Sequence, residues 1–92
     1  MGKPLKESKG ELKVMLSRMD ALIKLSEEAL ADEIIKEDNN SLQKITKEAL
    51  GNILIIAPWN YPLLTCVNVL TAGILSGNSV LMKHSPYTAT LG

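Results

Sequence analysis

No side chain between Gly51 and Met82 carries a full charge at neutral pH. Lys83 is the only charged residue after residue 50, and every other Lys, Arg, Asp and Glu lies within residues 1–50. A stretch without charges is buried either in protein or in lipid. Its longest strictly apolar run, Ile53 to Trp59, includes a proline, whereas a membrane-spanning helix needs about 18 apolar residues. We therefore expect burial in protein and no membrane partner.

The overall composition excludes several classes of function. Ten basic and ten acidic residues give a formal net charge of zero, so bulk charge attraction cannot drive binding to nucleic acid. One cysteine excludes an internal disulfide framework, and one cysteine with one histidine cannot build a Cys/His zinc site, so we expect no metal. No signal sequence is recognisable, which makes a cytoplasmic location the default expectation. The 92 residues correspond to one small domain or to a piece of a larger one.

The charged half begins with a helical pattern. Apolar residues recur at three- and four-residue steps, which predicts an amphipathic helix over residues 7–33 that covers one face of a sheet. Residues 37–41 form a polar segment with the chemistry of a turn. In residues 42–50, the spacing of Leu42, Ile45 and Ala49 fits a helix, but the β-branched pair at 45–46 suits a strand. We favour the strand.

The uncharged half predicts a strand, a helix and a second strand. The isoleucine-rich run Asn52 to Ala57 is typical of a strand that is covered on both faces in a parallel sheet. An apolar helix is predicted over residues 61–76, with Pro62 in its first turn and Gly77 as a left-handed terminator. Residues 78–82 form the second strand, which completes a βαβ unit over residues 52–86. Since sheets usually contain about four to six strands, we expect the chain to be part of a larger protein.

The two strands of a βαβ unit are parallel, so their carboxyl ends lie at the same edge of the sheet. Ligands bind at that edge in open α/β sheets. The residues that this geometry places in one neighbourhood are Trp59, Asn60, Lys83 and Ser85.

Several motifs occur together at characteristic spacings. They are Ile55-Ile56-Ala57-Pro58-Trp59-Asn60-Tyr61-Pro62, Ala72-Gly73, Ser76-Gly77-Asn78-Ser79-Val80 and Lys83-His84-Ser85-Pro86, with Gly2-Lys3-Pro4-Leu5 ahead of the first helix. This constellation closely resembles the aldehyde dehydrogenase superfamily over essentially the whole chain, and its Lys-His-Ser-Pro form is similar to members that act on succinate semialdehyde. The resemblance implies an α/β fold in which residues 1–92 are a fragment of a partial Rossmann-like cofactor-binding domain.

The superfamily oxidises aldehydes with NAD or NADP through a thiohemiacetal on a catalytic cysteine, and a glutamate activates the hydrolytic water. The resemblance implies that Asn60 holds the oxyanion through its side-chain amide, whereas the local pattern alone favours Asn60 as a helix N-cap. The nucleophile and the glutamate are expected beyond Gly92, so the chain alone is expected to be inactive. Cys66 lies inside the predicted helix, where a buried cysteine usually serves packing. Nothing in the spacing supports a catalytic pair with His84.

The resemblance also assigns a cofactor site. Its residues are Ala57, Pro58, Trp59, Lys83, Ser85 and Pro86. The first three correspond to the backbone stretch that lines the nucleotide, although a lone tryptophan is more often a core residue. Lys83 corresponds to the lysine that hydrogen-bonds the adenosine ribose, although an isolated lysine at a strand end more often reaches for water. Pro86 stands where many members have a glutamate that binds the ribose and repels a 2′-phosphate, so we expect the parent enzyme to use NADP⁺ as well as NAD⁺.

Assembly is the last implication of the resemblance. The superfamily pairs through a small β arm, which implies a homo-oligomer in addition to contacts with the remainder of the enzyme and with its aldehyde substrate. Residues 42–50 are a candidate strand of that arm, and the sequence does not identify the other strand. A non-catalytic remnant that acts, if at all, as an interaction piece stays open as an alternative, because unpaired strand edges favour association.

Overall fold

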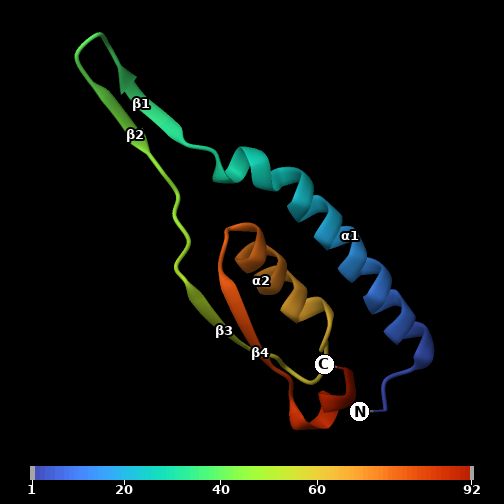
Figure 1. The fold of residues 1–92 in the computed structure, drawn as a ribbon. Helices are drawn as coiled ribbons and strands as arrows, with labels where there is room; N and C mark the ends of the chain where they lie inside the picture. Colours follow the sequence, from blue (N-terminus) through green and yellow to red (C-terminus); the bar gives the residue numbers. More distant parts are fainter. Residues whose placement is uncertain (1, 92) are drawn as a thin grey trace.

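The computed structural model describes residues 2–91 of the chain (Figure 1). Its elements in chain order are α1 (Leu5–Leu30), β1 (Glu33–Glu37), β2 (Leu42–Ile45), β3 (Asn52–Ile56), α2 (Leu64–Leu75), β4 (Ser79–Lys83) and a 3₁₀ helix η1 (Pro86–Leu91). The predicted α/β class is confirmed, because a long helix precedes a hairpin and a strand–helix–strand unit. Within residues 2–91, no helix is both long enough and apolar enough to cross a membrane.

The parallel βαβ unit is present as predicted. β3 and β4 pair in parallel, with a register that runs from Asn52 opposite Ser79 to Ile56 opposite Lys83. α2 connects the two strands and packs against both. Each strand differs by one residue from its predicted span, because β3 ends at Ile56 and β4 runs from Ser79 to Lys83.

α2 begins at Leu64 rather than at residue 61. Pro62 is completely buried in the turn before the helix instead of lying in its first turn. The residue at the N-cap, Leu63, makes no side-chain hydrogen bond to the helix. At the other end, Gly77 has a φ of 86°, the left-handed conformation that glycine adopts without a steric penalty, so the predicted terminator is confirmed.

Two residues fix α2 against the sheet. Asn78 accepts a hydrogen bond at Oδ1 from the N–H of Gly51 (2.9 Å) and donates from Nδ2 to the carbonyl of Gly73 (3.1 Å). Gly73 allows the close approach itself, because a Cβ at this position would lie 3.3 Å from Ile53 Cδ1 and 3.3 Å from Val80 Cγ2. The helix is therefore held at short range over one face of the sheet.

α1 packs on α2 and not on the sheet, which corrects the prediction that this helix covers a sheet face (Figure 1). Its half-buried Met15 and Met19 face the α2 side chains Val67 and Leu70 across a shared cavity. The unit therefore has three layers, in the order α1, α2, sheet.

The opposite face of the sheet is open within residues 2–91. Leu54 is 60% exposed and Ile56 is 71% exposed, whereas Ile55, which points toward α2, is only 7% exposed. The expectation that β3 is covered on both faces is therefore wrong for the part of the chain described here.

β1 and β2 form an antiparallel hairpin that extends away from the helices (Figure 1). The register pairs Glu33 with Ile45 and Glu37 with Leu42. The helix predicted over residues 7–33 instead ends at Leu30, and only Leu42–Ile45 of the candidate strand 42–50 is a strand. β1 is the partner strand that the sequence analysis did not identify.

Asp38 closes the hairpin turn. Its Oδ1 accepts hydrogen bonds from the N–H groups of Asn40 (2.9 Å) and Ser41 (2.7 Å). The hydrogen bond from Asn40, followed by those from Ser41, lowers the pKa of the Asp38 carboxyl. The polar segment 37–41 is therefore a turn as predicted, although Glu37 itself belongs to β1.

Candidate functional site

The carboxyl ends of β3 and β4 lie side by side, as the topology predicts. Ile56 is opposite Lys83 in the register, and the next N–H, that of Ala57, donates to the carbonyl of Lys83 (2.9 Å). Ala57 is only 6% exposed. The loops that follow the two strands therefore start from one fixed point at the sheet edge.

The side chains around this edge differ in exposure. Trp59 is 54% exposed, which excludes a core position for it within this chain. Lys83 and Pro86 are exposed, and Pro58 and Ser85 are half-buried. The edge therefore presents an exposed aromatic residue and an exposed lysine, with a half-buried serine beside them.

Ser85 lies between β4 and η1. Its carbonyl accepts a hydrogen bond from the N–H of Thr88 (3.0 Å), and its Oγ accepts a longer one from the N–H of Tyr87 (3.4 Å). These bonds turn the chain back directly after β4.

Asn60 lies exposed in the loop between β3 and α2. Its side-chain amide makes no hydrogen bond to any group within residues 2–91, and the N-cap of α2 is Leu63 instead. The N-cap interpretation of Asn60 is therefore wrong, and its amide can donate to a group outside the described chain.

Glu11 performs the capping that α2 lacks locally. This residue of α1 is only 6% exposed, and its Oε1 accepts hydrogen bonds from the N–H groups of Leu63 (2.9 Å) and Leu64 (3.0 Å). Its Oε2 accepts a hydrogen bond from Lys3 Nζ (2.7 Å). Burial opposes ionisation, but the bonds from Lys3 and the two N–H groups outweigh it and lower the pKa of Glu11.

Lys3 connects the same cluster to the Asn60 loop. Its Nζ also donates to the backbone carbonyl of Asn60 (3.2 Å) and lies 3.9 Å from the centroid of the Tyr61 ring. The side chain is only 9% exposed. Lys3 and Glu11 together therefore hold the loop between β3 and α2 from two sides.

Sequence reasoning missed this pair, although a signal was present. Glu11 precedes Met15 and Met19 at steps of four residues, so it lies on the apolar stripe of α1 and not on its charged face. A carboxylate on a buried stripe needs partners, which points to a contact with another segment.

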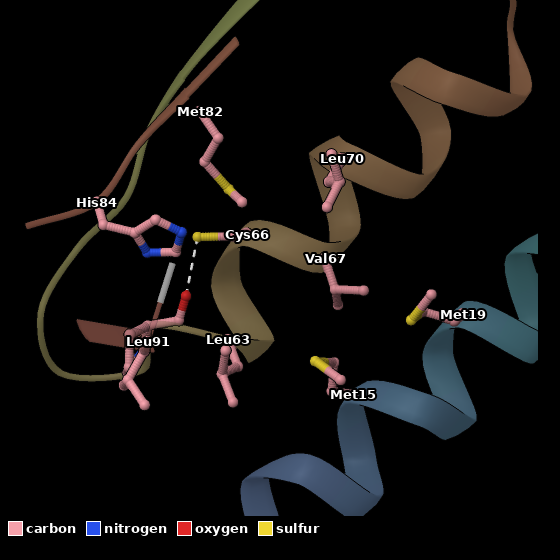
Figure 2. Close-up of a pocket in the computed structure, with 10 residues that line it drawn as sticks. Met15, Met19, Leu63, Cys66, Val67, Leu70, Met82, His84 and Leu91 are labelled. Atoms are coloured by element: carbon pink, nitrogen blue, oxygen red, sulfur yellow. Dashed lines mark hydrogen bonds between the residues drawn. The ribbon is translucent and has the colours of Figure 1, made fainter. Parts of the chain in front are cut away.

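An apolar cavity of about 280 Å³ lies between the helices and the end of β4 (Figure 2). It is lined by Met15, Met19, Pro62, Leu63, Cys66, Val67, Leu70, Met82, His84 and Leu91. The Cys66 thiol donates to the carbonyl of Pro62 (3.0 Å), and burial, followed by the charge of Glu11, raises its pKa. A buried thiol with a raised pKa is a poor nucleophile.

His84 lies near Cys66 in this cavity, a proximity that the sequence spacing did not indicate (Figure 2). The thiol hydrogen bond goes to Pro62 and not to the imidazole. The packing interpretation of Cys66 therefore agrees with its surroundings. Elsewhere in residues 2–91, no three His, Cys, Asp or Glu side chains gather as metal ligands would.

Comparison of the sequence with known proteins identifies a matching family and several relatives. Residues 1–92 match the family model described as "Aldehyde dehydrogenase family". The chain is 34% identical over 85 residues to the NADP(+) succinate-semialdehyde dehydrogenase of Deinococcus radiodurans, an alignment that covers 92% of the chain. It is 33% identical over 86 residues to the NAD(P)+ succinate semialdehyde dehydrogenase Sad of Escherichia coli, which covers 94% of the chain.

A third relative, the 3,6-anhydro-alpha-L-galactose dehydrogenase of Streptomyces coelicolor, is 29% identical over 87 residues, or 95% of the chain. The chain spans only 18% of the length of each of these three relatives. No solved structure matches the chain. Because the family model matches all 92 residues, this chain belongs to the aldehyde dehydrogenase family.

Proposed function

We propose that the complete protein oxidises an aldehyde to a carboxylic acid with NAD⁺ or NADP⁺, and that this segment supplies parts of its oxyanion and cofactor sites. Family membership supports the reaction class. The observation that carries the assignment is the exposed Asn60 amide, which has no hydrogen-bond partner within residues 2–91 and follows β3 at the ligand edge. The names of two relatives favour a small aldehyde such as succinate semialdehyde.

The role proposed for Asn60 is that of a neutral donor. Its Nδ2–H donates to the aldehyde oxygen as negative charge develops there during nucleophilic attack. A fixed donor of this kind is worth about 3–4 kcal/mol in comparable sites. The attacking thiolate and the carboxylate that activates water belong to other parts of the proposed enzyme, since Cys66 is buried with a raised pKa.

The residues at the sheet edge fit a dinucleotide. The exposed Lys83 ammonium can donate to ribose hydroxyls, and Ser85 adds a hydroxyl two residues later. The segment Ala57 to Trp59 leaves the sheet at the same point and offers a backbone surface with an exposed ring. A nicotinamide cofactor held by these residues would supply the acceptor for the hydride that the tetrahedral adduct gives up.

The experiment that tests this function is an assay of the purified complete gene product. Reduced nicotinamide is followed by its absorbance while succinate semialdehyde, aliphatic aldehydes and aromatic aldehydes are supplied in turn with each cofactor. The proposal predicts turnover with at least one aldehyde. A folded protein that reduces neither cofactor with any of them contradicts it.

A sharper prediction concerns Pro86 and the choice between NAD⁺ and NADP⁺. The side chain of Pro86 carries neither a charge nor a hydrogen-bond acceptor. The wild type is expected to use NADP⁺ as well as NAD⁺. Pro86→Glu is expected to lower kcat/KM for NADP⁺ by about tenfold or more, because contact between like charges costs several kcal/mol. Pro86→Gln, which adds bulk without charge, is the control. A wild type that turns over NAD⁺ but shows no NADP⁺ activity overturns the prediction.

We also propose that the β1–β2 hairpin contributes to a homo-oligomer and that the enzyme is cytoplasmic. A second candidate function is a non-catalytic interaction role, which the exposed apolar side chains of the hairpin favour, among them Ile34 and Ile45. A complete gene product that assembles but oxidises no aldehyde would support that second role instead.

A further inference from the structure

We infer that the buried pair formed by Lys3 and Glu11, the Lys3–Glu11 clamp, is a positioning device that fixes the loop carrying Asn60. The catalytic part of this inference rests on the function proposed above. Both residues lie outside the sheet edge, and neither has a role in the oxyanion or cofactor assignments.

The first argument concerns the acceptor to which the first N–H groups of α2 donate their hydrogen bonds. The first N–H groups of a helix need an acceptor, which the residue at the N-cap usually supplies. Leu63 cannot supply one, and the acceptor is Oε1 of Glu11, which lies 2.9 Å and 3.0 Å from the nitrogens of Leu63 and Leu64. The position of α2 therefore depends on a side chain from α1.

The second argument is that the clamp holds the loop at two points, at Asn60 and at the start of α2. Lys3 Nζ donates to the Asn60 carbonyl (3.2 Å) and lies 3.9 Å from the centre of the Tyr61 ring, while Glu11 holds residues 63 and 64. Between these anchors, Pro62 is completely buried. The backbone on which the Asn60 amide stands is therefore fixed, while the amide itself stays exposed.

The third argument concerns burial. The Lys3 and Glu11 side chains are 9% and 4% exposed, and 2.7 Å separates Lys3 Nζ from Glu11 Oε2. A buried ion pair is weak evidence for stability by itself. Here Lys3 and Glu11 bond to each other and to the loop between β3 and α2. The arrangement therefore points to control of the geometry of that loop.

The enzymatic test uses the complete gene product with Glu11→Ala, Glu11→Gln and the control Glu7→Gln, which changes an exposed acid on the same helix. Displacement of the Asn60 amide should weaken oxyanion binding and leave the binding of cofactor alone. We expect Glu11→Ala to lower kcat by about 10- to 100-fold with little change in the cofactor KM. Glu11→Gln keeps an acceptor oxygen and should retain more activity, and Glu7→Gln should match the wild type.

A double variant separates positioning from general damage. If Glu11 acts through Asn60, Glu11→Ala combined with Asn60→Ala should be no slower than Asn60→Ala alone. Losses that multiply, or a Glu11→Ala enzyme with an unchanged kcat, overturn the inference. Should Glu11→Ala fail to fold, the same comparison is made with Glu11→Gln, which has the same shape.

Hydrogen exchange tests the clamp without any activity. Amides at the start of α2 should exchange about tenfold faster in Glu11→Ala than in the wild type, because they lose charge-assisted bonds, whereas Glu7→Gln should leave them unchanged. Unchanged exchange in Glu11→Ala overturns the clamp. If the complete protein oxidises no aldehyde, the proposed function fails, and this measurement still decides whether the clamp holds the loop.

Discussion

Glu11 joins three parts of this chain that are separate in the sequence. It accepts hydrogen bonds from a lysine ahead of α1 and from two backbone N–H groups at the start of α2. A carboxylate is tolerated in such a buried place only when its lone pairs are used. Lys3, which pairs with the Glu11 carboxylate, also donates to the Asn60 carbonyl, so the buried ion pair is connected directly to the Asn60 loop.

The sequence predicted where the proposed site residues lie in the fold better than it predicted the contacts that support them. Asn60 follows β3 and Lys83 is the last residue of β4. The isoleucine-rich and uncharged pattern identifies both strands, and the parallel topology brings their ends together. The support was missed because Glu11 bonds to residues more than 50 positions away. No local spacing rule describes a contact of that length.

The lowered pKa of Glu11 predicts a pH dependence. A carboxyl whose pKa is lower in the folded state contributes stability above its unfolded pKa, and that contribution is lost as the pH falls through the folded value. The difference in thermal midpoint between wild type and Glu11→Gln should therefore be largest near neutral pH and shrink below pH ~4. The measurement is a series of melting curves from neutral to acid pH. A difference that stays constant, or that grows as the pH falls, contradicts the assignment, and Glu7→Gln serves as the control.

At the scale of elements, agreement between local signals decided which predictions were correct. The unit β3–α2–β4 was predicted because the apolar runs, the glycine terminator and the length of the helix all favour the same structure. Of the hairpin, only β1 was missed, because Ile34 continues the helical spacing of Leu30 and no glycine marks the end of α1. Every residue of β1 and β2 is exposed, so neither strand shows the alternation typical of a half-buried strand.

The close contact between α2 and the sheet predicts that a larger side chain at position 73 lowers the stability of the protein. Gly73→Val is expected to lower the stability by about 1–3 kcal/mol, because side-chain atoms of Ile53 and Val80 already lie 3.3 Å from the Cβ position. Gly10→Ala is the matched control, since Gly10 is also helical but has nothing within 4 Å of its Cβ position. That change should stabilise the protein by about 0.5–1 kcal/mol. Thermal melting checks both, and equal effects of the two variants would rule out close packing at Gly73.

At the scale of the whole molecule, the chain is long and thin, with extents of 64 × 24 × 13 Å. The hairpin extends from one end (Figure 1). The exposed side chains of Leu54 and Ile56 leave one face of the sheet open within residues 2–91. The chain spans 18% of the length of the relatives compared above. The sequence indicated this incompleteness, because β3 and β4 have the apolar pattern of central strands and yet pair only with each other within residues 2–91.

The hairpin predicts an effect on assembly. Ile34→Lys replaces an apolar side chain that is 59% exposed with a charged one. The variant should have a lower oligomer mass, measured by light scattering after gel filtration. Gln43→Lys adds the same charge at a polar position of the same hairpin and should leave the mass unchanged. Equal masses for wild type and both variants would show that this part of the hairpin is not an assembly surface.

The central claim, that the Asn60 amide stabilises an oxyanion, is tested most directly by the steady-state kinetics of Asn60→Ala in the complete gene product. Asn39→Ala is the control, because Asn39 is exposed in the hairpin turn away from the sheet edge. Asn60→Ala should lower kcat by roughly 10²- to 10³-fold with little change in the cofactor KM, and Asn39→Ala should behave as the wild type. An Asn60→Ala enzyme that keeps the wild-type kcat would contradict the account.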